Sequence, residues 1–149
     1  MRRVSDVDAD HPDTRRLLEA YFEELRERLG SFEAPSIEQL RADAERGVVL
    51  LAYDEEKAVA CGALRRVDDV TAEVKRMFVA HDARGKGHGL TVLRALEDAA
   101  RSMGYRRIVL DTAAPLAEAA NMYLREGYVA IERYNDNPYA ARWFGKDLA

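Results

Sequence analysis

Residues 84–89, Arg84-Gly85-Lys86-Gly87-His88-Gly89, stand between a strand-like segment, 72–79, and a helix-like segment, 90–103. Three glycines at alternate positions leave the backbone amides of this loop uncovered by side chains. The positive end of the dipole of the following helix points back at these amides. Converging amides at a helix N-terminus suit an anion, and above all a phosphate or pyrophosphate group. The stretch therefore predicts a phosphate site at a strand-to-helix junction.

Two common phosphate-binding motifs fit this loop poorly. A Walker loop needs Lys-Ser or Lys-Thr after its last glycine, but Leu90 follows Gly89. A dinucleotide fingerprint, G-x-G-x-x-G, is matched by Gly85 and Gly87, but Leu90 replaces its third glycine. Asp111 ends the next strand, where it could be mistaken for the ribose-binding acid of that motif. A nucleotide-dependent oxidoreductase thus stays an alternative, and it predicts affinity for NAD over coenzyme A.

The segments around the loop predict a mixed sheet covered by helices. Apolar residues recur at helical spacing over 17–29, and a second helix follows Pro35. Ser36 is expected to cap that helix with Gln39 as its capping-box partner, and Gly47 is expected as its C′ glycine. Further helices are predicted at 90–103 and 116–126, ended by Gly104 and Gly127, and strands at 48–53, 58–67, 70–79, 108–112, 128–133 and 141–148, with a short strand around Arg3-Val4 in front.

A third pattern, R/Q-x-x-G-x-G/A between a strand and a helix, is filled by Arg84, Gly87 and Gly89. Together with the stretches 73–79 (EVKRMFV) and 123–128 (YLREGY), it resembles the GNAT superfamily of acetyl-CoA-dependent N-acetyltransferases. The resemblance covers residues 47–148, and its ending looks like that of bacterial small-molecule members. Residues 1–46 match only in forming two helices where the family places its substrate-covering helices.

The resemblance implies the fold as well as the activity. It implies an α/β (α+β) fold in one domain, residues 1–149, with a mixed, mostly antiparallel sheet of six to seven strands and about four helices. The acetyl-CoA-binding core would be residues 47–133, and 1–46 and 134–149 would be substrate-side and closing elements. The implied reaction moves acetyl from acetyl-CoA, a co-substrate, to a primary amine by direct attack in a ternary complex.

The resemblance also implies which residues hold coenzyme A. The loop amides would bind its pyrophosphate, and a bulge in the strand before the loop would leave backbone groups for the pantetheine arm. Relatives often have an asparagine near the start of the helix at 116–126, but Ala117 stands there and Asn121 lies one turn later, so that contact stays open. The implied carrier-binding residues are Met77, Phe78, Val79, Arg84, Gly85, Lys86, Gly87, His88, Gly89, Leu90 and Asn121.

Two residues match positions that relatives use for catalysis. Acetyl transfer to an amine needs a base for the ammonium and an acid for the departing thiolate. Glu73 matches the carboxylate base of many relatives, often acting through water, and its alternative is an ordinary solvated strand glutamate. Tyr123 matches the tyrosine that protonates the sulfur, and its alternative is a core tyrosine. His88 is expected to be exposed on the first helical turn.

Composition limits the partners that the chain suits. The 149 residues carry a net charge of −4 with both signs interleaved, so we expect no nucleic-acid partner. No apolar run is long enough to cross a bilayer, and residues 1–6 lack the apolar block of a signal peptide, so we expect a cytoplasmic protein without a membrane partner. One cysteine, Cys61, and three scattered histidines predict no metal site.

The acceptor and the assembly are less constrained. We expect a small-molecule amine, because no acidic groove for a basic peptide can be inferred. A homodimer is plausible for such a sheet. A non-catalytic acyl-CoA-binding sensor or regulatory module is the main alternative, because it would keep the glycine loop without needing the chemistry of Glu73 and Tyr123.

Overall fold

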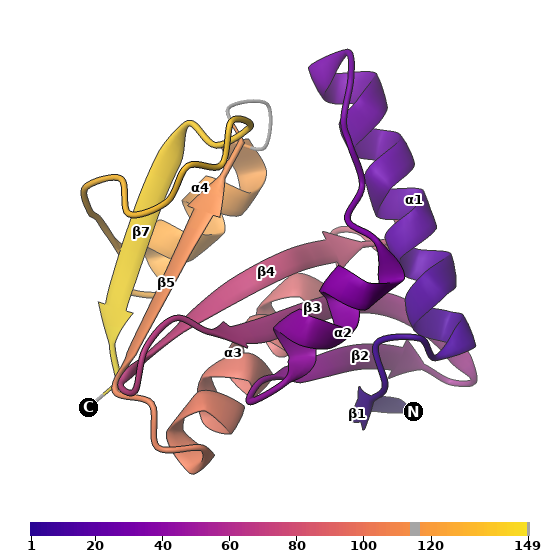
Figure 1. The fold of residues 1–149 in the computed structure, drawn as a ribbon. Coiled ribbons are helices and arrows are strands. Elements are labelled where there is room, and N and C mark those ends of the chain that lie inside the picture. Colours follow the sequence, from indigo (N-terminus) through magenta and orange to yellow (C-terminus); the bar gives the residue numbers. More distant parts are fainter. Residues whose placement is uncertain (114–116, 149) are drawn as a thin grey trace.

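A computed structural model describes residues 1–113 and 117–148 of the chain. Within these residues one mixed sheet has the strand order β1-β2-β3-β4-β5-β7-β6 (Figure 1). The strands are β1 Arg2–Val7, β2 Val48–Asp54, β3 Lys57–Arg66, β4 Thr71–Val79, β5 Arg107–Thr112, β6 Val129–Ala130 and β7 Arg142–Asp147. The helices are α1 Pro12–Leu29, α2 Ile37–Ala44, α3 His88–Ser102 and α4 Ala117–Arg125, with a short 3₁₀ turn at His81–Ala83. All neighbouring strands are antiparallel except β4 and β5, which confirms the predicted fold class.

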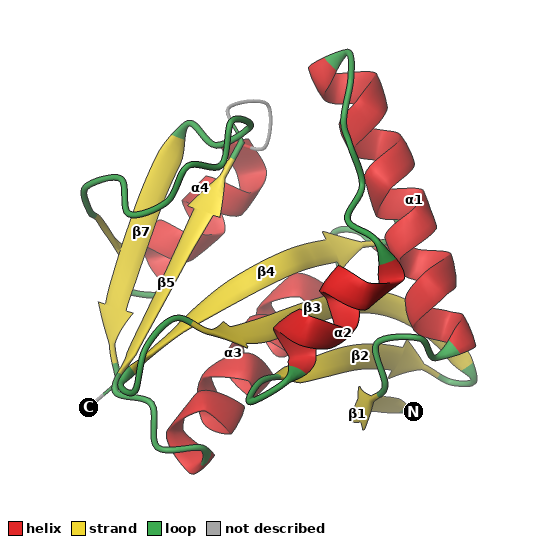
Figure 2. Cartoon of the chain, viewed as in Figure 1, coloured by secondary structure: helices red, strands yellow, loops and turns green. Residues whose placement is uncertain are grey.

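The helices cover the two faces of the sheet (Figure 2). Leu93 and Leu96 of α3 and Tyr123 of α4 are buried in one core with β2, β3, β4, β5 and β7. Leu17 and Phe22 of α1 are buried on the other face. The buried side of α3 is therefore formed by apolar residues at helical spacing, Leu93, Leu96 and Ala100, whereas Met103 after its end is exposed.

Local sequence signals explain most helix ends. The Ser36 hydroxyl accepts a hydrogen bond from the backbone amide of Gln39 at 3.1 Å, as predicted for the N-cap. The predicted role of Gln39 as capping-box partner is wrong, because its side chain donates to Asp43 at 2.8 Å instead of returning to Ser36. Gly104 and Gly127 have φ of 89° and 91°, the left-handed conformation that ends a helix. The role predicted for Gly47 is wrong, because α2 ends at Ala44 and Gly47 does not have a positive φ. A Cβ at Gly47 would lie 2.0 Å from the Leu64 carbonyl oxygen, so close packing on β3 requires this glycine.

The strand predicted at 128–133 is much shorter in the structure. Only Val129 and Ala130 form β6, an edge strand whose two side chains are exposed. The chain then turns back toward the middle of the sheet, where the side chains of Tyr134 and Asn135 bond to β4 and β5. The start of the helix predicted from residue 116 lies outside the described residues, and the described helix ends at Arg125.

The sheet opens between its two central strands. The parallel strands β4 and β5 pair only over Thr71–Glu73 and Arg107–Val109. Beyond these residues the two strands diverge (Figure 1). The later residues of β4 therefore have no strand partner on the β5 side, which leaves backbone donors and acceptors there for a ligand.

Candidate active site

A β-bulge lies where β4 separates from β5. Cys61 pairs with Phe78 and Ala63 with Lys75, so Gly62 alone faces both Arg76 and Met77. Arg76 has a positive φ of 57°, and this residue lies in the bulge, where the alternation of side chains between the two faces of the sheet is interrupted. The resemblance implies carrier-binding residues at 77–79, and the bulge itself lies at Arg76 and Met77. Gly62, which faces the bulge, is closely packed, because a Cβ there would lie 2.7 Å from the Met77 sulfur.

A large cleft of about 660 Å³ runs along the second half of β4 to the glycine loop. All the predicted carrier-binding residues line this cleft except Lys86 and Asn121, which are both exposed. Its other walls include Glu24 of α1, Met122 of α4 and Glu126, which directly follows α4. We call it the carrier cleft. A contact between Asn121 and coenzyme A stays a prediction, because Asn121 does not line this cleft.

The glycine loop at the end of the carrier cleft has the backbone expected of an anion site. Gly85 and Gly87 have φ of 80° and 85°, and Gly87 is the N-cap of α3. Within the described part of the chain, no backbone amide of residues 85–90 donates a hydrogen bond to another backbone group. A Cβ at Gly85 or Gly87 would meet no atom within 4 Å, so conformation and open access, not packing, require glycine here. The loop therefore fits a pyrophosphate group.

The Arg84 side chain stabilises the loop. Its guanidinium pairs with Glu24 of α1 at 2.7 Å, and its Nε donates to the Val79 carbonyl at 3.0 Å. The Lys86 carbonyl accepts a hydrogen bond from Arg2 at 2.8 Å. These contacts hold both ends of the loop to neighbouring elements.

His88 is buried, not exposed as the sequence suggested. Its side chain is 2% exposed, and its Nε2 atom has no hydrogen-bond partner and lies 3.8 Å from Asp54 Oδ2. Burial lowers the pKa of the imidazole, and the positive charge of Arg2 adds to this, while Asp54 acts in the opposite direction. The ring packs under the loop because α3 begins at this residue, two positions earlier than predicted.

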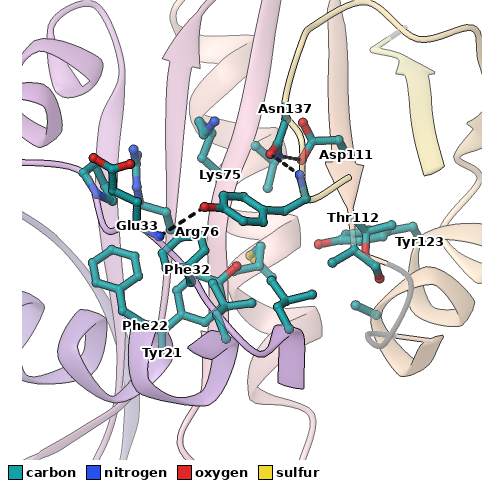
Figure 3. Close-up of a pocket in the computed structure, with 18 residues that line it drawn as sticks. Tyr21, Phe22, Phe32, Glu33, Lys75, Arg76, Asp111, Thr112, Tyr123 and Asn137 are labelled. Atoms are coloured by element: carbon teal, nitrogen blue, oxygen red, sulfur yellow. Dashed lines mark hydrogen bonds between the residues drawn. The ribbon is translucent and has the colours of Figure 1, made fainter. Parts of the chain in front are cut away.

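A second, smaller cavity of about 290 Å³ lies between α1 and the carboxyl end of β5 (Figure 3). We call it the inner cavity. Figure 3 shows Tyr21, Phe22 and Phe32 on one side of it and Asp111, Thr112 and Tyr123 on the other. The residues common to the inner cavity and the carrier cleft are Tyr21, Met77, Ala119 and Tyr123.

Tyr123 combines the two interpretations that its sequence position allowed. Its ring is buried and lies 5.6 Å from the Tyr128 ring and 6.2 Å from the Phe144 ring, as a core tyrosine would. Its side chain also lines both cavities. Burial raises the pKa of the phenol, and Tyr21 and Asp111 add to this effect, so the phenol keeps its proton at neutral pH.

Glu73 is buried, so it is not a solvated strand glutamate. Its carboxylate accepts hydrogen bonds from Tyr134 and from Asn135, the latter at 3.3 Å, and lies 3.3 Å from Arg65 Nε. Glu73 does not line the inner cavity, whereas Asp111 does. Sequence reasoning missed Asp111 as an acceptor-side carboxylate. Its place at the end of the strand beside β4 was the available signal.

Comparisons with known proteins identify the family. The model of the acetyltransferase (GNAT) family matches residues 11–128. The chain belongs to the GNAT family. Similar GNAT structures include an acyl-CoA N-acyltransferase described from Klebsiella pneumoniae, with a TM-score of 0.80 and 24% identity over 100% of this chain and 99% of that one. Another, from Elizabethkingia anophelis with acetyl-CoA bound, has a TM-score of 0.73 and 18% identity over 99% and 98% of the two chains.

Curated GNAT relatives are longer than this chain. It is 32% identical to a probable N-acetyltransferase 14 of Xenopus tropicalis over 106 residues, 70% of this chain and 52% of that protein. The chain spans about half the length of the curated relatives that it matches. No helix in the described part of this GNAT chain has the length and apolar character needed to cross a membrane. The same residues contain no group of three or more His, Cys, Asp or Glu side chains that could hold a metal ion.

Proposed function

We propose that this GNAT protein is an N-acetyltransferase that moves acetyl from acetyl-CoA to a primary amine while both are bound. The observation that carries the proposal is the contact between the two cavities at Met77 and Tyr123. A carrier in the larger cleft and an acceptor in the inner cavity would meet there. The acetyl-CoA-bound relative of the same fold supports the choice of carrier.

We assign three parts of coenzyme A to three parts of the carrier cleft. The amides of 85–90 and the N-terminus of α3 would bind the diphosphate. The edge of β4 that has no partner beyond Glu73 would offer backbone groups of residues 77–79 to the pantetheine amides. The apolar side chains of Phe78 and Met122 would contact the rest of the arm.

The chemistry needs two proton movements, and this chain has groups for both. The acceptor ammonium first loses a proton, and the amine nitrogen then forms a bond to the thioester carbonyl carbon. The carbon–sulfur bond breaks as Tyr123 gives its phenolic proton to the departing thiolate, and the second proton of the amine then restores the Tyr123 phenol. As base, Glu73 would act through water, because it does not line the inner cavity.

Coenzyme A binding tests the carrier site. Gly87→Val places a β-branched side chain at a φ of 85° and inside the cleft, and we expect calorimetry to show loss of acetyl-CoA uptake. Gly104→Val is the matched control, because Gly104 has φ of 89° at the other end of α3, also with no atom within 4 Å of its Cβ. If both substitutions reduce acetyl-CoA uptake equally, the loss is caused by backbone strain alone and not by damage to the anion site.

Turnover tests the reaction. With acetyl-CoA and primary amines, we expect release of free thiol together with the acetylated amine. Uptake of acetyl-CoA without release of free thiol in the presence of any amine would identify an acyl-CoA-binding module instead. Preferential uptake of NAD would contradict both interpretations.

A further inference from the structure

Asp111 lies in the inner cavity without a cationic partner. Its Oδ2 atom accepts a hydrogen bond from the Asn135 side chain at 2.6 Å, and its Oδ1 atom accepts one from Asn137 at 3.1 Å. Both donors are neutral amides. Among the described residues no Lys, Arg or His forms a salt bridge with Asp111.

The loop that supplies these amides is itself held in place. The Asn135 side-chain oxygen accepts a hydrogen bond from Trp143 Nε1 at 2.9 Å, and that of Asn137 accepts one from the Tyr139 amide at 3.0 Å. The orientation of both amides toward Asp111 is therefore fixed by the fold. Asp111 is positioned as a preformed anionic group.

The cations that line the same cavity already have acidic partners. Arg76 pairs with the buried Asp43 at 2.7 Å. Lys75 lies 4.0 Å from Glu73. A substrate carboxylate would meet the negative charge of Asp111, and the two cations in the lining each already lie within 4.0 Å of a carboxylate of the protein. The charge pattern favours a ligand that carries a positive charge and no negative one.

The wall opposite Asp111 is aromatic (Figure 3). Phe22 and Phe32 stack with ring centroids 5.5 Å apart, and Phe32 lies 4.9 Å from the Tyr139 ring. Tyr139 is fixed further, because its hydroxyl accepts a hydrogen bond from the Glu33 amide at 3.1 Å. These rings offer flat apolar surfaces to an apolar or aromatic body.

Building on the proposed function, we propose that the acceptor is a small arylalkylamine whose ammonium group binds Asp111 and whose ring packs on this aromatic wall. The volume of about 290 Å³ suits one ring with a short chain. Acetylation converts the ammonium into a neutral amide. The product therefore loses its ion pair with Asp111, which favours its release over the substrate.

Calorimetry with two isosteric probes tests the role of Asp111 without acetyl-CoA. We expect 2-phenylethylamine to bind the wild-type protein roughly 10- to 100-fold more tightly than the neutral 2-phenylethanol. In Asp111→Asn this preference should disappear while weak binding of the alcohol persists. Asp136→Asn is the matched control, because Asp136 is exposed in the same loop and does not line the cavity, and it should keep the preference.

Competing acceptors test the substrate class. With acetyl-CoA present, kcat/KM for 2-phenylethylamine should exceed that for phenylalanine and for spermidine by at least about tenfold. Faster acetylation of phenylalanine or spermidine would overturn the proposed class and leave the acetyltransferase proposal intact. Absence of ammonium preference in the wild-type protein, or its survival in Asp111→Asn, would overturn the role of Asp111. Failure of acetyl-CoA to bind would instead contradict the proposed function, since amine binding is measured separately.

Discussion

At the scale of single residues, Tyr123 is the group that we propose as the acid for the sulfur, because it lines both cavities. Its hydroxyl can be removed without removing its ring, because Phe keeps the contacts with Tyr128 and Phe144. In Tyr123→Phe we therefore expect kcat for thiol release to fall about 100-fold, while the acetyl-CoA Kd and the free energy of unfolding stay close to wild type. Turnover at the wild-type rate would remove the acid role. Steady-state kinetics and calorimetry on the same preparation provide both measurements.

His88 gives a second prediction at this scale, concerning stability and pH. Its folded pKa lies below the ordinary value of 6.5, so at pH values between the two the unfolded chain binds a proton that the folded chain does not. The contribution of His88 to stability is therefore present above pH 6.5 and is lost as the pH falls below it, by at most about 1.4 kcal/mol per pH unit. In His88→Asn, the free energy of unfolding measured with urea should depend less steeply on pH over that range. The same slope in both proteins would contradict this origin.

At the scale of elements, the close packing of α3 and of the Met77 side chain on β3 requires a glycine at position 62. A Cβ at Gly62 would lie 2.7 Å from the Met77 sulfur and 2.8 Å from Cγ1 of the buried Val92. We expect Gly62→Ala to lower the free energy of unfolding by about 1–3 kcal/mol. It should also weaken binding in both cavities, because Met77 lines both. Denaturant titration and ligand calorimetry measure the two effects.

Gly145 on β7 is the control for that substitution. Its Cβ would lie 2.9 Å from the far end of the Arg107 side chain, which can move, and 3.3 Å from Ile131. Gly145→Ala should therefore lower the free energy of unfolding by less than Gly62→Ala does. An equal loss of stability would mean that any new Cβ in the sheet is destabilising and that the packing around Gly62 has no special demand for glycine.

Elements with local chemical signals could be predicted from the sequence, and contacts between distant residues could not. The N-cap at Ser36 and the glycine loop before α3 follow from residues within one or two turns. The burial of Glu73 depends on Tyr134, 61 positions away, and the amide donors of Asp111 come from a loop 24 and 26 positions away. Periodicity along one segment contains no information about such pairs. For the same reason 128–133 was assigned as strand, although most of it leaves the edge of the sheet to approach β4 and β5.

At the scale of the whole molecule, the carrier cleft connects helices from both faces of the sheet. Its lining includes Tyr21 of α1, His88 of α3 and Met122 of α4, and it passes through the opening between β4 and β5. Only three residue pairs join those two strands, so the interface between the halves of the sheet has few backbone bonds of its own. A ligand that contacts both halves therefore stabilises the entire fold.

Ligand-dependent melting tests this view of the molecule. Acetyl-CoA at 100 times its Kd should raise the free energy of unfolding by about 2.7 kcal/mol. For a chain of 149 residues this corresponds to a rise in Tm of roughly 5–11 °C. In Gly87→Val, acetyl-CoA should no longer raise the Tm. Gly104→Val should have a lower Tm than wild type, but acetyl-CoA should still raise it. NAD and ATP should produce no comparable rise, because the cleft along β4 matches the pantetheine arm that they lack. A rise with acetyl-CoA that survives in Gly87→Val would mean that the carrier binds away from the glycine loop.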